Sequence, residues 1–215
     1  MSEILKGYKY VDPAFANNVA KGALKIGTAD HYAKMESPLA DALDSRVRRQ
    51  QTGMVTKATY DPNDLAQKRA LARVGIVLGT MSNIANFEIG YNSFDYAAPA
   101  RYVLCLSRIA NNDHLVASGS SAVFAIEDVG EFARVLQEAN PGKLGPPAWE
   151  RVQYHERVIP AEIDTEVPPD PFIKRPSFFP EMELRITWVP VLVQPDPWFI
   201  SEPNERVAKM LSRLE

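Results

Sequence analysis

The chain has 215 residues and a net charge of −3, and 46% of its residues are hydrophobic and 24% are charged. These proportions are typical of an ordinary globular protein, so we expect one domain over residues 1–215 with a substantial core. The small negative charge gives no general attraction to nucleic acid or to an anionic membrane surface.

Targeting and metal signals are missing from the sequence. It has no apolar run of about 18 residues, and residues 1–6 lack the apolar stretch of a secretory signal. We therefore expect a cytoplasmic protein with no membrane partner. The single cysteine, Cys105, excludes an internal disulfide and a cysteine-based metal site. The three histidines lack metal-ligand spacing, so no metal is expected; they are His31, His114 and His155.

The first half of the chain mixes strand and helix signals. The Asp-Pro pairs at residues 12–13 and 61–62 are typical of helix starts, because aspartate caps a helix and proline suits its first turn. In chain order we predict a strand at 5–10, a helix at 12–22, a strand at 23–28, a polar loop or broken helix at 30–49, a helix at 63–73 and a turn at 92–97.

The second half is richer in strands. Many of the seventeen prolines lie at 141–147 and 160–180, which we predict to be loops. Asp128 is expected to cap a helix. In chain order we predict strands at 101–106 and 121–127, a helix at 128–139, strands at 151–158, 178–189 and 191–193, and a helix at about 201–214 that Ser201 caps. The fold class is α+β with an antiparallel-rich sheet.

Residues 178–189 carry the most distinctive pattern. Strand side chains alternate, so Glu181, Glu183 and Arg185 are predicted to share one face, while the residues between them face a core. In a cleft, such glutamates could stabilise a cation or take a proton. The same pattern also fits a solvated strand face with an ion pair.

A second charged group leaves two alternatives open. Its members could form a basic face for nucleic acid or nucleotide phosphate, or a solvated helix face. They are Arg46, Arg48, Arg49, Lys68, Arg69 and Arg73.

The order of these segments resembles a large family of bacterial domains with an ADP-ribosyltransferase-like layout. The resemblance covers about residues 7–190. It rests on Tyr8-Lys9-Tyr10, Leu24–Thr28, the polar stretch His31 to Asp44, Cys105-Leu106-Ser107, Val152-Gln153-Tyr154, Lys174, and Glu181, Glu183 and Arg185. Where relatives usually carry a tryptophan-x-histidine-tyrosine segment, this chain has Asp113 to Ser120.

The resemblance implies an ADP-ribosyltransferase-like α+β core over about residues 7–193, with a split, antiparallel-rich sheet and flanking helices. It implies NAD⁺ as substrate and an oxocarbenium-like transition state. Glu183 would be the essential carboxylate and Glu181 its partner on the acceptor side. Contacts to NAD⁺, or support of Glu183, would come from Lys9, Tyr10, His31, Tyr32, Ser107 and Arg185.

The expected function is therefore transfer of ADP-ribose to a protein or nucleic acid, in a bacterial or phage-linked toxin or antiphage defence effector with a possible antitoxin or immunity partner. Two alternatives stay open: a non-catalytic ligand- or partner-binding module of the same fold, and an NAD⁺ glycohydrolase.

Overall fold

The computed structural model describes residues 4–34, 46–51, 53–56, 59–77, 88–90, 92–97, 99–162 and 170–214. Where the sequence suggests one domain over 1–215, the chain packs as two compact units. The large unit comprises Met1–Ser45, Pro99–His155 and Pro171–Glu215, and the small unit comprises Arg46–Ala98 and Glu156–Asp170.

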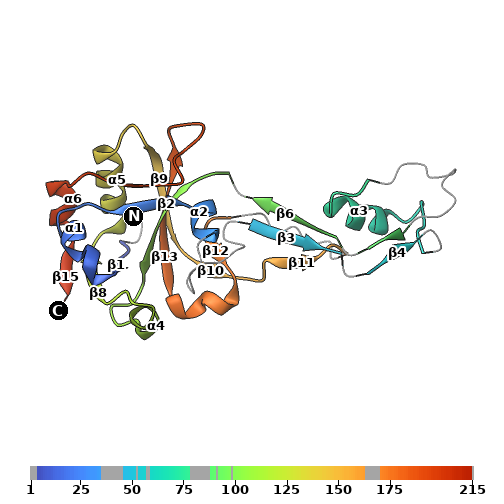
Figure 1. Ribbon diagram of the computed structural model, residues 1–215, viewed down its shortest axis with the longest axis horizontal. Coiled ribbons are helices and arrows are strands. Elements are labelled where there is room, and N and C mark those ends of the chain that lie inside the picture. The colour runs from blue at the N-terminus through green and yellow to red at the C-terminus, as the bar shows by residue number, and fades with distance from the viewer. Residues whose placement is uncertain are drawn as a thin grey trace. The chain divides into compact units, whose positions relative to one another are not determined.

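The large unit is built on an antiparallel sheet of eight strands (Figure 1). The strand order is β14-β2-β7-β1-β8-β15, and β13 pairs with β7 and β9. The strands are β1 (Gly7–Val11), β2 (Lys25–Thr28), β7 (Tyr102–Ser107), β8 (Ala122–Ile126), β9 (Leu144–Arg151), β13 (Glu183–Pro190), β14 (Trp198–Ile200) and β15 (Ser212–Leu214). The prediction of an α+β fold with an antiparallel-rich sheet is confirmed.

The sheet is split along one edge of β7. On its other edge, β7 pairs with β13 over its whole length. On the split edge, β2 pairs only at Tyr102 and Val103, and β1 pairs at Ser107. Between these two points the Lys9 Nζ donates a hydrogen bond to the Cys105 carbonyl at 3.1 Å. The Lys9 side chain therefore satisfies a β7 carbonyl where the neighbouring strands diverge.

Helices cover one face of this sheet and form the main core. Figure 1 shows α1, α5 and α6 gathered on one side and α2 on the other. Side chains from all three helices pack with alternate residues of β7 and β13, including Leu104, Ile186 and Trp188. The opposite face of the same strands is therefore left for polar residues. The helices of this unit are α1 (Ala16–Ala20), α2 (Ala29–Ala33), α4 (Asp113–Ala117), α5 (Val129–Ala139), α6 (Glu205–Lys209), and the 3₁₀ helices η1 (Pro13–Phe15) and η2 (Pro176–Glu181).

The helix-capping signals were good guides to two of these helices. Asp128 accepts the Glu131 N–H at 2.9 Å and begins α5 where predicted. Asp12 accepts the Ala14 N–H at 2.8 Å and begins η1, which continues into α1.

The C-terminal helix predicted at 201–214 was wrong in extent. Asn204, not Ser201, caps α6, which ends at Lys209. Residues 212–214 instead form β15, which pairs with β8 and satisfies backbone groups at that edge of the sheet.

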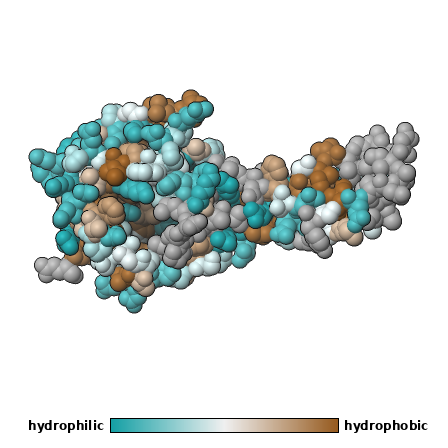
Figure 2. Space-filling view, viewed as in Figure 1, coloured by the Kyte–Doolittle hydropathy of each residue, from teal (hydrophilic) through white to brown (hydrophobic). Residues whose placement is uncertain are grey.

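The strand predicted at 191–193 is also absent, because the chain bends there between β13 and β14. Val191, Leu192 and Val193 are exposed. Figure 2 shows a hydrophobic patch at the upper edge of the large unit, over this turn.

The loop predicted at 141–147 from its prolines was wrong in part, because β9 begins within it. This strand begins at Leu144 and includes Pro146 and Pro147, within the predicted loop at 141–147. Among the described strands it pairs with β13 alone, so its other edge needs no backbone donors, and proline is tolerated there. The predicted strand at 151–158 is instead divided among the end of β9, β10 (Gln153–Tyr154) and the start of β11 (Val158–Pro160). In the predicted loop at 160–180, β12 (Ile173–Lys174) pairs with β10 in parallel.

The small unit holds a three-stranded sheet of order β11-β3-β6. Residues 46–50 form β3, not a loop or helix, and residues 93–97 form β6, not a turn, because each strand supplies the partner of the other. The six basic residues do not share one helix: Arg49 is buried in β3, whereas Lys68 and Arg69 are exposed on the helix over 65–73. The remaining elements are β3 (Arg46–Gln50), β4 (Val55–Thr56), β5 (Glu88–Ile89), β6 (Ser93–Ala97) and α3 (Leu65–Arg73), which Asp64 caps.

Removal of the α5 cap should lower the stability of the large unit. We expect Asp128→Ala to reduce the free energy of unfolding by about 1 kcal/mol, because the Glu131 N–H loses its acceptor. Asp128→Asn keeps an acceptor and should lose much less. All three tryptophans lie in the large unit, so their fluorescence in urea follows its unfolding. Equal losses in both variants would contradict the capping role.

Candidate functional site

Three segments that are far apart in the sequence meet in one row of the large sheet. Tyr8 of β1 lies opposite Ser107 of β7, and Ser107 lies opposite Glu183 of β13. Opposite residues in an antiparallel ladder share a face. This row therefore brings Tyr8, Ser107 and Glu183 together on the face away from the core, whereas Lys9 lies opposite the core residue Phe124.

Glu183 and Arg185 form a buried bidentate ion pair on that face. The Arg185 Nε donates to Glu183 Oε1 at 2.6 Å, and Nη2 donates to Oε2 at 3.2 Å. A third guanidinium nitrogen donates to the Pro171 carbonyl at 2.6 Å. Glu183 is 2% exposed and Arg185 is fully buried. The prediction that these two side chains share a strand face is confirmed.

Glu181 reaches the same place by a different route from the one predicted. It ends the 3₁₀ helix η2 and does not lie on β13. Met182 follows with φ of 47°, a left-handed conformation that is unfavourable for a side chain of this type. The predicted strand therefore begins only at Glu183, and Met182 does not take its predicted place in the core.

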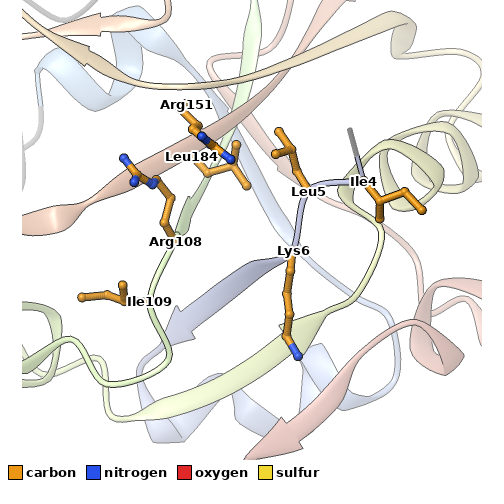
Figure 3. Close-up of a pocket in the computed structure, with 7 residues that line it drawn as sticks. All are labelled: Ile4, Leu5, Lys6, Arg108, Ile109, Arg151 and Leu184. Atoms are coloured by element: carbon orange, nitrogen blue, oxygen red, sulfur yellow. The ribbon is translucent and has the colours of Figure 1, made fainter. Parts of the chain in front are cut away.

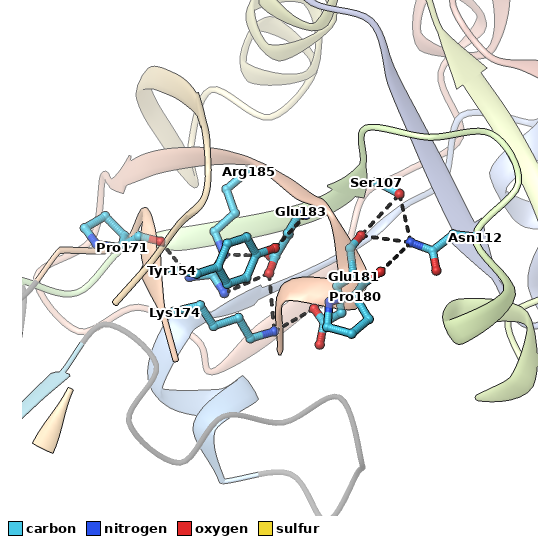
Figure 4. A network of polar contacts seen from close by, with 9 residues as sticks. All are labelled: Ser107, Asn112, Tyr154, Pro171, Lys174, Pro180, Glu181, Glu183 and Arg185. Atoms are coloured by element: carbon cyan, nitrogen blue, oxygen red, sulfur yellow. Dashed lines mark hydrogen bonds and ion pairs between the residues drawn. The ribbon is translucent and has the colours of Figure 1, made fainter. Parts of the chain in front are cut away.

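Lys174 joins the two glutamates. Its Nζ contacts Glu181 Oε2 at 2.7 Å and Glu183 Oε2 at 3.3 Å (Figure 4). Lys174 is 3% exposed and comes from β12. In the sequence it appeared only as part of a motif, since nothing in its own surroundings indicated that it would be buried.

Ser107 and Asn112 donate hydrogen bonds to the main chain at Glu181. The Ser107 hydroxyl donates to the Glu181 carbonyl at 3.2 Å. The Asn112 side-chain amide donates to the same carbonyl at 3.0 Å and to the Pro180 carbonyl at 3.1 Å. Ser107 thus positions Glu181 through its main chain. Asn112 was missed by the sequence reasoning, although its place before Asp113 is typical of a helix cap, a role it also fills in α4.

Tyr10 supports the loop between β7 and α4. Its hydroxyl contacts the Ala110 carbonyl and accepts the Asn112 N–H at 2.8 Å. Tyr154 plays a similar part at β13, where its hydroxyl accepts the Glu183 N–H at 2.8 Å. Burial raises the pKa of Tyr154 to about 12, so this hydroxyl stays protonated at neutral pH.

His31 and Tyr32 lie over the small residue Gly27 of β2. A Cβ atom on Gly27 would stand 3.0 Å from the Tyr32 ring and 3.1 Å from the His31 ring, so glycine permits this approach. Burial lowers the pKa of His31, and Lys25 adds to this effect. The His31 Nε2 is buried and has no hydrogen-bond partner among the described residues. These two rings therefore border the polar face, one strand beyond β7.

The two carboxyl groups differ in ionisation. Burial alone would raise the pKa of Glu183, but Arg185 and Lys174 together hold it well below its ordinary value. Burial raises the pKa of Glu181 to about 7, and the charge of Glu183 adds to this rise, against the opposing effect of Lys174. The Glu181 Oε1 has no partner among the described residues. At neutral pH the site thus combines a fixed anion with a carboxyl group that can gain or lose a proton.

Comparison of the chain with protein-family models, with curated proteins and with solved structures finds no match. In the described part of the chain, no group of three His, Cys, Asp or Glu side chains is placed to hold a metal ion. No helix formed by the described residues has the length and apolar character needed to cross a membrane.

The shared lysine should be essential for stability. We expect Lys174→Met to lower the free energy of unfolding by about 3–5 kcal/mol, because it leaves buried carboxylates without compensation. Lys34→Met is the control, since the Lys34–Asp30 pair is exposed and should contribute less than about 1 kcal/mol. Urea denaturation compares the two variants. Similar small losses would show that the buried cluster does not depend on Lys174.

The raised pKa of Glu181 predicts a pH-dependent stability. Between pH 4.5, the ordinary pKa of the glutamate side chain, and about 7, Glu181 is ionised in the unfolded chain but still protonated in the native state. The free energy of unfolding therefore falls as pH rises through this range. The effect is about 1.4 kcal/mol for each unit of pKa difference. Glu181→Gln removes it.

From pH 5 to pH 8, the stability of Glu181→Gln relative to the native chain should therefore increase. The lowered pKa of Glu183 acts in the opposite direction, but its contribution is lost only as pH falls below the ordinary value of 4.5. A difference in unfolding free energy that stays constant over this pH range would contradict the assignment to Glu181.

Proposed function

We propose that the chain is an NAD⁺-dependent ADP-ribosyltransferase in which Glu183 and Glu181 are the reacting carboxyl groups. The observation that carries the proposal is the pair itself: two buried carboxyl groups share Lys174 and differ widely in pKa. Environments that separate the pKa values of neighbouring acids are typical of acid–base sites. The meeting of β1, β7 and β13 motifs in one row gives further support, because the resemblance in the sequence rests on these motifs.

In this reaction the bond between nicotinamide and ribose breaks, and its electron pair leaves with nicotinamide. The ribose carbon becomes positively charged, and the fixed carboxylate of Glu183 stabilises that charge. The acceptor attacks this carbon and passes its proton to Glu181. Ser107 and Asn112 act as positioning residues, because they hold the Glu181 backbone. The acceptor is a protein or a nucleic acid, and the setting a bacterial toxin or defence effector with a cognate antitoxin.

A second candidate is a non-catalytic binding module of the same fold. The observation in its favour is burial: none of the four ionic residues is more than 6% exposed. They are Lys174, Glu181, Glu183 and Arg185. In this second function the buried ionic cluster is structural: it stabilises the fold in the way that apolar side chains do in the core, and it holds η2 against β13.

Substitution of Glu183 separates these functions. We expect Glu183→Gln to reduce nicotinamide release from NAD⁺ by about 100-fold or more, because the charge that stabilises the transition state is lost. The control is Glu138→Gln, which changes an exposed glutamate paired with Arg206 on the helical side of the large unit. The assay follows labelled NAD⁺ with a cell lysate as the source of acceptor, and tryptophan fluorescence verifies folding.

Label on a macromolecule establishes transfer, and nicotinamide release without transfer establishes an NAD⁺ glycohydrolase. Equal turnover by the two variants would remove Glu183 from the chemistry. Folded native protein without any turnover would favour the binding module.

The role of Glu181 predicts a pH profile. As a base it must be ionised, so kcat/KM of the native chain should rise with pH and level off above about 7. Glu181→Gln should lower the plateau by about 100-fold and abolish the rise. An unchanged midpoint in this variant would assign the titration to another group.

A further inference from the structure

The small unit contains a pocket of its own, with a volume of about 290 Å³. This volume is close to the lower limit of the range for small-molecule sites, roughly 300–1,000 Å³, so the pocket suits a small ligand. Half of its ten lining residues have apolar side chains. They are Met54, Val55, Ala66, Ala70 and Leu71, of which the last three belong to α3.

One polar side chain of the lining is buried with an oxygen that lacks a donor. Gln51 is 3% exposed, and its Nε2 donates a hydrogen bond to the Gly53 carbonyl. Its Oε1 is buried and has no hydrogen-bond partner among the described residues. The Gln51 main chain is held in place, because its N–H donates to the Asn92 carbonyl at 2.8 Å. Because a buried oxygen without a donor is unfavourable, a ligand that brings an N–H group would satisfy it.

Asp64 adds a negative charge to the same pocket. Its Oδ1 accepts the N–H groups of Ala66 at 2.9 Å and Gln67 at 3.1 Å, which fixes the carboxylate at the start of α3. Within the described part of the chain, no contact occupies its Oδ2. The pocket therefore offers a ligand two fixed oxygen acceptors, Gln51 Oε1 and Asp64 Oδ2.

The other two polar side chains of the lining are already engaged. The Gln67 amide donates to the Thr59 carbonyl at 3.0 Å and accepts the Asp61 N–H at 2.9 Å. Glu162 has an interaction within the protein, so recognition of a ligand rests on Gln51 and Asp64.

The charge of this lining differs from that of the pocket in the large unit. None of the ten described lining residues in the small unit is basic. Figure 3 shows the other pocket, where Lys6, Arg108 and Arg151 provide the charged side chains and the described lining includes no carboxylate. A cation therefore finds an acidic partner in the pocket of the small unit and none in the lining of the other.

We propose that the pocket of the small unit binds a small organic cation that has an N–H donor head group and an aliphatic body. The head group donates to Gln51 Oε1 and to the Asp64 carboxylate. The body packs against Val55, Ala70 and Leu71. Ammonium and guanidinium groups share this chemistry, and the probes below distinguish them. The proposal is independent of NAD⁺ chemistry, because the carboxyl pair belongs to the large unit.

The test is calorimetric titration of the full chain with hexylammonium and with hexylguanidinium. Methylammonium supplies the charge without the body, 1-hexanol supplies the body without the charge, and hexanoate reverses the charge. We expect at least one hexyl cation to bind more tightly than all three of these probes, by about tenfold or more, because it alone combines both features. The tighter of the two cations identifies the head group.

Variants then place the binding in the pocket. Gln51→Leu removes the unpartnered oxygen and should weaken the preferred cation by about tenfold, the usual effect of losing a hydrogen bond to a charged group. Asp64→Asn keeps an acceptor for the helix cap but removes the charge. Ala66→Lys adds a repelling charge at an exposed position of the lining. Each of these two charge changes should weaken binding about threefold or more.

Two matched controls change the same charges outside the lining. Asp61→Asn alters an exposed aspartate that also accepts a main-chain N–H, and Ala72→Lys adds a lysine at an exposed position of α3. Both should retain nearly native affinity. Amide NMR spectra verify the folding of each variant, since the tryptophans all lie in the large unit. Absence of binding by both hexyl cations, equal binding of 1-hexanol or hexanoate, or native affinity in the folded pocket variants would overturn the proposal.

Discussion

Burial of the Glu183 carboxylate is the constraint on which the polar side of the large unit depends. An isolated buried carboxylate is too costly to persist in ionised form, so its partners must be fixed in position. Arg185 is supplied by the same strand, but Lys174 comes from β12 and brings that segment with it. Glu181 then shares Lys174, and this places the end of η2 over the same spot. One buried charge thus organises two chain segments, β12 and η2, around β13.

The cations satisfy Glu183 fully and Glu181 only in part. Arg185 gives two hydrogen bonds to Glu183, while Glu181 has one cationic contact and an oxygen without a partner among the described residues. Burial therefore dominates at Glu181, whereas attraction to cations dominates at Glu183. The two glutamate carboxyl groups differ in pKa because the cations are shared unequally between them. Such a difference is useful for proton transfer, and it also makes the native state sensitive to pH.

Main-chain contacts link the two faces of β13. Met182 stands between the glutamates in a left-handed conformation, and its carbonyl accepts the Arg108 N–H. Ser107 contacts both sides, since its hydroxyl donates to the Glu181 carbonyl and accepts the Ile109 N–H. The turn that orients Glu181 is therefore joined by hydrogen bonds to the backbone that follows β7. Strand alternation sends Glu183 to the polar face and Leu184 to the core.

Local pattern in the sequence determined the α+β class, the alternation on β13 and the start of α5, because caps and side-chain period depend on residues close together in the chain. It also brought out Glu183 and Arg185, whereas Ser107 was named only through the resemblance. Tertiary structure decided what depends on distant partners: β3 and β6 exist because they pair with each other, and β15 because β8 has an edge to fill. It also decided the burial of Lys174, the support from Asn112 and the arrival of Glu181 from a 3₁₀ helix. No local period encodes such contacts, since each requires segments that meet only when the sheet has formed.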